Sequence, residues 1–249
     1  MTKLAGLTLL IALLSVSVAR ADARVRVSYL ITQYGGYVFP ATDNAKVDNL
    51  GLTLGRDFGA AGKSSRVAFL GGELGLETPI GTSSYLQVSS RVSETSLRLS
   101  PASAEQSGVE ALASLGLGFW APITESWRAG LEAGIRGRKW LLEGGPLPSS
   151  GHGGFTVAAR IESEKWEGLF ELGAMAIGLG TPSELGVQRD ASTLRARVGY
   201  FADSPRSGFS PFLEFFHTHR DFFATTLVAN EPALFVDEAK LVLGLGWIL

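Results

Sequence analysis

The chain has 249 residues, no cysteine and a formal net charge of −2 at pH 7. Without cysteine it can hold no disulfide framework, no thiolate metal site and no cysteine nucleophile. The balanced charge lacks the clustered basic excess of proteins that bind nucleic acid, so we expect no nucleic-acid partner. Beyond the N-terminal segment no apolar run reaches the roughly 18 residues of a spanning helix, which excludes a helical membrane protein.

The first residues have the pattern of an export signal. Lys3 precedes an almost entirely apolar stretch from Leu4 to Ala19, and Ala19-Arg20-Ala21 places small residues where signal peptidase reads the chain. We therefore expect residues 1–21 to be a signal peptide that is cleaved after Ala21. A retained membrane anchor is the alternative, but the apolar run is short for a spanning helix.

The rest of the chain alternates apolar residues with polar residues or glycine. In residues 126–140 the odd positions from Trp127 to Ile135 are apolar, whereas the even positions from Arg128 to Arg136 are charged or glycine. A strand places successive side chains on opposite faces, so each such segment predicts a two-faced strand. In chain order, strands are predicted near 24–38, 47–58, 66–77, 84–99, 108–120, 126–140, 153–163, 168–178, 191–202, 208–219 and 237–249.

The alternation changes phase inside one segment and is weak in another. In residues 84–99 the apolar positions change from even to odd, which predicts a β-bulge near Ser93-Glu94-Thr95. Residues Tyr29 to Phe39 are rich in Tyr and Gly and alternate poorly. Since bacterial single-chain barrels have an even number of strands, eleven candidates imply that the N-terminal one is separate or that one is missing.

Strand length and the C-terminus favour a membrane barrel over a soluble β-sandwich. The segments match the roughly 9–11 tilted residues that cross a bilayer, where sandwich strands average about 5–6. The chain ends inside an apolar strand, and a barrel needs a full-length last strand because lipid tolerates no open edge. Four tryptophans lie at inferred turns or at the chain end, namely Trp120, Trp127, Trp166 and Trp247. This distribution predicts an aromatic girdle at the lipid–water boundary, with core packing as the alternative.

The C-terminal residues resemble the recognition strand of bacterial outer-membrane barrel proteins. Trp247 supplies an aromatic residue, and Leu249 stands where a terminal Phe is more usual. The resemblance implies that Trp247 and Leu249 form a C-terminal assembly signal, and that the barrel-assembly machinery is a partner. We therefore expect a protein of the Gram-negative outer membrane in contact with outer-membrane lipid and lipopolysaccharide.

The predicted fold is all-β, a transmembrane antiparallel up-and-down barrel of about ten strands, with twelve as the alternative. The barrel is expected over residues 46–249, with residues 22–45 acting as an N-terminal strand, a plug or a periplasmic segment. If the last strand runs toward the periplasm, the links near 78–83, 121–126, 163–167 and 203–208 are periplasmic. The links at 100–107, 141–152, 180–191 and 220–236 are longer and then face outward, which is the usual asymmetry.

The non-apolar strand faces carry charges of both signs that should line the lumen. Because small barrels are filled by their own side chains, this predicts a narrow, occluded barrel with a structural or envelope role. A porin-like, weakly anion-preferring channel for small solutes is the alternative. The predicted lumen ladder is Glu110, Arg128, Glu132, Arg136, Arg138, Arg160, Glu162, Arg195 and Arg197. The same strand faces also carry Glu73, Glu77, Glu171, Glu214, Arg91, Arg98 and Lys240.

One group of residues raises the question of catalysis. His217 and His219 share one face of a predicted strand, and Glu231 follows in the next loop. In placement this resembles the lipid A deacylase barrels, which implies a lipid-facing hydrolase as a third function. The resemblance departs at His219, which stands where that family carries its serine nucleophile, so the acyl transfer lacks an attacking group. The sequence predicts no metal site, since only His152 or Glu231 could join two histidines, and no cofactor.

Overall fold

The computed structural model describes residues 24–40, 62–63, 69–97, 106–142, 150–180, 187–203, 206–223 and 232–249. The regular elements in these ranges are strands, and no helix among them is long and apolar enough to cross a membrane. The strands are β1 (Arg24–Pro40), β2 (Gly62–Lys63), β3 (Phe69–Pro79), β4 (Ser84–Leu97), β5 (Gln106–Pro122), β6 (Arg128–Leu142), β7 (Ser150–Glu162), β8 (Trp166–Gly180), β9 (Val187–Tyr200), β10 (Gly208–Phe223) and β11 (Pro232–Ile248).

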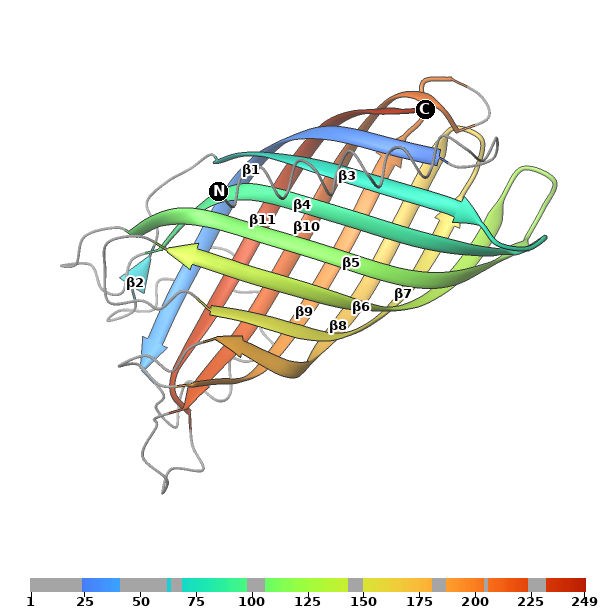
Figure 1. Ribbon diagram of the computed structural model, residues 1–249. Coiled ribbons are helices and arrows are strands. Elements are labelled where there is room, and N and C mark those ends of the chain that lie inside the picture. The colour runs from blue at the N-terminus through green and yellow to red at the C-terminus, as the bar shows by residue number, and fades with distance from the viewer. Residues whose placement is uncertain are drawn as a thin grey trace, which may run out of the picture.

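The strands form one closed antiparallel sheet (Figure 1). From β3 to β11 each strand pairs with the next in the chain, β1 pairs with β3, and β11 returns to pair with β1. The two residues of β2 pair only with β1. The result is a ten-strand up-and-down barrel, which confirms the predicted fold class and strand number.

Strand β1 closes the barrel. It pairs with β11 from Arg26 opposite Ile248 to Pro40 opposite Leu234, and with β3 along its first half. Val25 and Leu249 exchange backbone hydrogen bonds of 3.2 and 2.9 Å at the end of this seam. The described wall thus begins at Arg24 and not near residue 46, because backbone pairing does not require the side-chain alternation that residues 29–39 lack. The predicted strand at 47–58 lies outside the described residues.

The short links gather at one end of the barrel, at the right of Figure 1, which we call the turn end; the opposite end is the loop end. Side-chain hydroxyls stabilise two of these links, at 123–127 and 163–165. The Thr124 hydroxyl accepts hydrogen bonds from the backbone amides two and three residues further on, and the Ser163 hydroxyl does the same. After Asp203 the described backbone is left-handed at Arg206, with a φ of 58°, and at Gly208, with a φ of 81°. A side chain there would strike the Asp203 carboxylate, so glycine is required.

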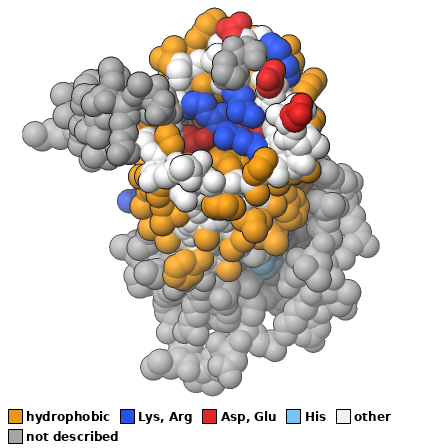
Figure 2. Space-filling model, turned by 90° about the vertical axis from the view of Figure 1, so that its right-hand side faces the viewer, with side chains coloured by type: hydrophobic (Ala, Val, Ile, Leu, Met, Phe, Trp, Pro, Cys, Tyr) orange, Lys and Arg blue, Asp and Glu red, His pale blue; other side chains and the backbone are white. Residues whose placement is uncertain are grey.

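The outer surface is apolar. Outward-facing Leu131, Phe155 and Leu117 are 68%, 65% and 57% exposed, although each is a large hydrophobic residue. Figure 2 views the turn end and shows hydrophobic side chains around a central group of basic ones. Exposed apolar surface of this extent is unfavourable in water and is the expected contact surface for lipid.

Two predicted details are wrong. The pairing of β4 with β5 runs unshifted from Ser84 opposite Phe119 to Leu97 opposite Gln106, so there is no bulge near Ser93. Trp120 does not join the girdle: it is 7% exposed, because its position on β5 alternates with outward-facing Phe119 at 54%. Trp127, Trp166 and Trp247 are exposed on the outside, as an aromatic girdle requires.

Candidate functional site

The lumen is the candidate site, and the described side chains of the predicted ladder all face it. Strand alternation places them opposite the exposed apolar residues, and several are almost fully buried, with Glu162 and Arg138 at 1% and 2% exposure. The ladder residues come from β5, β6, β7 and β9. Arg98 lies outside the described residues. The side chains form three groups along the barrel axis.

The middle group joins two glutamates to three arginines. Glu214 on β10 accepts hydrogen bonds from Arg91 at 2.5 Å, Arg195 at 2.6 Å and Arg197 at 2.9 Å. Glu73 on β3 accepts from Arg91 at 2.9 Å and from Arg197 at 2.8 Å. Around the ring β3 and β4 lie on the other side of the lumen from β9 and β10, so this group crosses the barrel. It therefore obstructs the lumen at mid-height.

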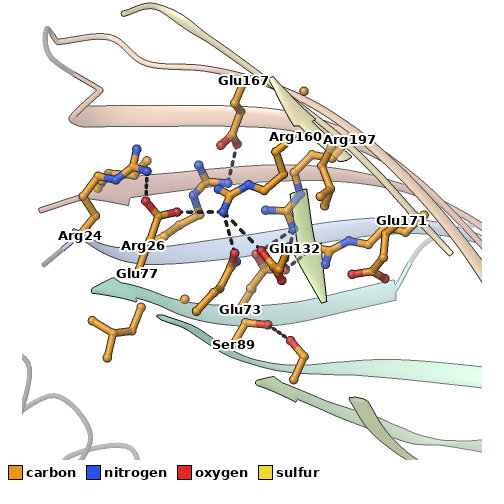
Figure 3. A pocket seen from close by; sticks show the side chains of 18 residues that line it. Arg24, Arg26, Glu73, Glu77, Ser89, Glu132, Arg160, Glu167, Glu171 and Arg197 are labelled. Carbon is orange, nitrogen blue, oxygen red and sulfur yellow. Dashed lines mark hydrogen bonds and ion pairs between the residues drawn. The ribbon is translucent and has the colours of Figure 1, made fainter. Parts of the chain in front are cut away.

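The turn-end group also crosses the barrel. Glu162 on β7 accepts from Arg128 at 2.6 Å and from Arg160 at 3.2 Å, and it lies 3.5 Å from Arg24 of β1. Glu77 on β3 binds Arg24 and accepts from Arg160 at 2.9 Å. Figure 3 shows Arg24 and Arg160 converging on Glu77 from opposite walls. These ion pairs therefore connect facing walls of the barrel at the turn end of the lumen.

Two aromatic rings support this group. Tyr85 and Trp120 stack with their centroids 5.3 Å apart. The guanidinium of Arg128 lies 4.0 Å from the Trp120 ring centroid, and that of Arg160 lies 4.9 Å from it. Cation–π contact of this kind is worth more when the charge is desolvated. Trp120, which was predicted to lie in the aromatic girdle, is therefore part of the lumen packing.

The loop-end group centres on Arg138 of β6. Arg138 binds Glu110 at 2.5 Å and Glu238 of β11 at 2.7 Å. Arg220 binds the same Glu238 at 2.5 Å, and its guanidinium lies 3.7 Å from the ring centroid of Trp140. Both arginine side chains are 1% exposed. A desolvated guanidinium needs such partners, since burying an unpaired charge is costly.

A further pair and a small hollow lie between these groups. Arg136 and Glu171 form a bidentate ion pair from β6 to β8, with side chains 4% and 5% exposed. A cavity of about 70 Å³ lies beside Glu171 and reaches Arg24 near the turn end. Space of this size holds a few water molecules, and its walls carry arginine and glutamate side chains in equal number (Figure 3).

Several lumen residues had no place in the predicted set. Arg24 and Arg26 were missed because the N-terminal segment was not assigned to the barrel, and Glu167 because it was placed in a turn. Arg220 and Glu238 are on the inner face of strands β10 and β11. The strand boundaries chosen from the sequence stopped at 219, which excluded Arg220. Extending the predicted strand by one residue would have included it.

The two predicted histidines of β10 and the C-terminal pair lie on the outer side of the barrel wall. His217 is half-buried and His219 is 8% exposed, both on the outward positions of β10. Glu231 lies outside the described residues. Trp247 and Leu249 are 51% and 72% exposed at the turn end. Among the described residues no group of three or more His, Cys, Asp or Glu could hold a metal ion.

Fold and lumen together define a transmembrane β-barrel with a charge-filled interior. The chain matches no protein-family model, and no curated protein matches it. Among solved structures it is similar to the outer membrane protease OmpT of Escherichia coli, at 9% identity and a TM-score of 0.47, over 92% of this chain and 96% of that one. The translocator domain of the autotransporter NalP of Neisseria meningitidis gives 13% and 0.40, over 99% and 96%. Outer membrane phospholipase A of Escherichia coli gives 11% and 0.35, over 89% of each chain. Likeness at this level carries no argument about function.

Proposed function

We propose that this protein is an outer-membrane barrel closed by its own ion pairs, with a structural role in the cell envelope. The observation that carries the proposal is the middle group, in which Glu214 receives three arginines and Glu73 links two of them from the other wall. An open channel needs a hydrated path. Here the charges that would line that path bind one another instead.

Barrel size and energetics support this reading. Barrels of about eight strands are filled by side chains, whereas aqueous channels appear near 16, and this barrel has ten. Removing one partner of a buried pair leaves an uncompensated charge and costs about 3–5 kcal/mol. The groups at the turn end, middle and loop end would each have to open for a solute to pass. The lumen thus acts as a rigid core.

The outer surface and chain ends support the location. The apolar outer surface of the barrel is suited to contact with lipid. The expected signal peptide at residues 1–21 would export the chain. We propose that the turn end faces the periplasm, with outer-membrane lipid and lipopolysaccharide around the wall. Trp247 and Leu249 would then be read by the barrel-assembly machinery. Both side chains are exposed on the last strand, where another protein can reach them.

Efflux from proteoliposomes tests the closed lumen. Vesicles loaded with a small fluorescent anion and reconstituted with the wild-type protein should retain it as long as empty vesicles do. The double variant Arg195→Ala/Glu214→Ala removes a 2.6 Å pair without changing net charge and should increase leakage. Leu213→Ala on the outer face of β10 is the matched control and should not leak. Rapid efflux through the wild type would overturn the proposal.

A small-anion channel is the second candidate, and one observation favours it. Basic side chains outnumber acidic ones among the described inward positions. The basic residues are Arg24, Arg26, Arg91, Arg128, Arg136, Arg138, Arg160, Arg195, Arg197, Arg220 and Lys240, and the acidic ones are Glu73, Glu77, Glu110, Glu132, Glu162, Glu167, Glu171, Glu214 and Glu238. A cationic lumen attracts anions. In the same assay this candidate predicts selective anion loss from wild-type vesicles.

A further inference from the structure

The middle group of the lumen has one more positive charge than negative charges. It consists of three arginines and two glutamates, namely Arg91, Arg195, Arg197, Glu73 and Glu214. None of the five side chains is more than 10% exposed. Arginine keeps its proton in proteins, so the group cannot lose the extra charge by deprotonation. Because a buried charge without a counter-charge is costly, this group favours the binding of one further anion.

The extra charge lies at Arg195. Each of the other two arginines binds both glutamates at 2.9 Å or less. Arg195 donates a hydrogen bond to Glu214 at 2.6 Å but lies 3.7 Å from Glu73. On the neighbouring strand Arg195 is directly opposite Glu171, whose two carboxylate oxygens both accept hydrogen bonds from Arg136. The acid beside Arg195 is therefore already neutralised by another guanidinium.

The cavity of about 70 Å³ in the lumen lies against this arginine. Its walls include Arg195, Arg197 and Glu73 of the middle group. Figure 3 shows Arg197 and Glu73 meeting at the cavity. From there the cavity extends to Arg24 at the turn end, whose side chain is 23% exposed. It thus offers a route from the turn end to Arg195 that does not cross the middle group.

The size and charge of the cavity favour a small monovalent anion. Space of about 70 Å³ holds a few water molecules, or a halide ion with part of its hydration shell. Two other acids of the wall have close cationic partners, since Glu167 pairs with Arg26 at 2.6 Å and Glu77 with Arg160 at 2.9 Å. A third, Glu132, lies 3.5 Å from Arg160. One negative charge balances the middle group, whereas a divalent anion would leave it negative.

We propose that the cavity beside Arg195 binds one monovalent anion of about the size of chloride, as the third negative charge of the middle group. The guanidinium groups of Arg195 and Arg197 supply the hydrogen-bond donors. The bound anion reduces the repulsion among the three arginines and so stabilises the closed lumen. The inference rests on the closed lumen proposed above, because it places the anion in a cavity that ends at the middle group.

Urea unfolding of the mature protein in detergent tests the site. The two conditions are sodium chloride and sodium gluconate at equal ionic strength, so that general screening is the same. Gluconate is too large for the cavity. A site that is half-filled at about 30 mM would raise the folded-to-unfolded ratio about tenfold in about 300 mM chloride. Equal folded-to-unfolded ratios in the two salts would overturn the proposal.

Three variants with the same change of charge locate the effect. Arg195→Met removes the extra charge, so its folded-to-unfolded ratio should differ less than twofold between the two salts. Arg136→Met leaves Glu171 available to Arg195 and should also remove most of the chloride effect. Arg128→Met changes a turn-end arginine whose side chain is not among those that line the cavity, and it should keep the tenfold effect. A full chloride effect in Arg195→Met would contradict the site.

Bromide gives a readout that does not depend on stability. Crystals of the wild-type protein soaked in sodium bromide should show an anomalous peak within about 3.5 Å of the Arg195 guanidinium. A quiet bilayer recording together with no bromide at Arg195 would overturn the anion site and leave the closed lumen standing. Steady wild-type currents would overturn the closed lumen itself, whatever the bromide result.

Discussion

Arg26 on β1 and Glu167 on β8 form a 2.6 Å ion pair, with side chains 13% and 9% exposed. The two strands lie on opposite sides of the ring, so the pair ties the closing seam of the barrel to the far wall. Arg26 also lies 5.7 Å from the ring centroid of Phe212, inside the lumen. The seam is thus held by side chains as well as by the hydrogen bonds between β1 and β11.

The Arg26–Glu167 pair should show strong coupling. Arg26→Met leaves Glu167 buried without its partner and should destabilise the folded barrel by about 3–5 kcal/mol. The double variant Arg26→Met/Glu167→Leu removes both charges and should recover much of that loss, because apolar side chains of similar volume often replace a buried pair at little cost. Urea unfolding in detergent measures each free energy. Additive losses would show that the two residues are not coupled.

Glu162 should matter more than Glu132. Glu162 is 1% exposed and binds Arg128 and Arg160, so Glu162→Ala leaves guanidinium groups short of an acid and should cost about 3–5 kcal/mol. Glu132 accepts a 3.2 Å hydrogen bond from Tyr85 and lies 3.5 Å from Arg160. Without Glu132, Arg160 still has its ion pair with Glu162. Glu132→Ala should therefore cost only about 1 kcal/mol. The same unfolding measurement compares them, and equal losses would contradict this reading of the turn-end group.

Trp247 and Leu249 should act in assembly more than in stability. Both are exposed on the outer face, so Trp247→Ser/Leu249→Ser removes little lumen packing. If the terminal strand is the recognition signal, the variant should be exported but accumulate in the periplasm. Fractionation with immunoblotting measures this, with Leu213→Ser, also outward-facing, as the control. Normal outer-membrane levels of the double variant would show that these side chains are not the signal.

The strands from β3 onward could be predicted from the sequence because their outer faces are mostly apolar. The last strand is an example: Leu241, Leu243 and Leu245 alternate with inward residues, and all three are exposed in the structure. Strand β1 was predicted near 24–38 but was not assigned to the barrel wall, because Tyr34-Gly35-Gly36-Tyr37 does not alternate, whereas its pairing depends on the backbone. Local patterns identify faces, but they do not identify strands held mainly by hydrogen bonds to their neighbours.

The partners within the lumen could not be predicted. Alternation placed Arg195 and Arg197 on an inward face, but nothing in their local sequence points to Glu73, more than 100 residues earlier in the chain. Which acid meets which arginine follows from barrel closure and stagger. Cross-strand neighbours require the register, which is a property of the folded sheet.

Single-channel recording of the wild-type protein in a planar bilayer tests most directly whether the lumen is closed. Because the middle group joins Arg91, Arg195 and Arg197 to Glu73 and Glu214 across the barrel, we expect a quiet baseline at moderate voltage and neutral pH. Arg195→Ala/Glu214→Ala should then give discrete openings in the same bilayers. Steady wild-type currents that prefer anions would contradict the closed lumen and favour the channel.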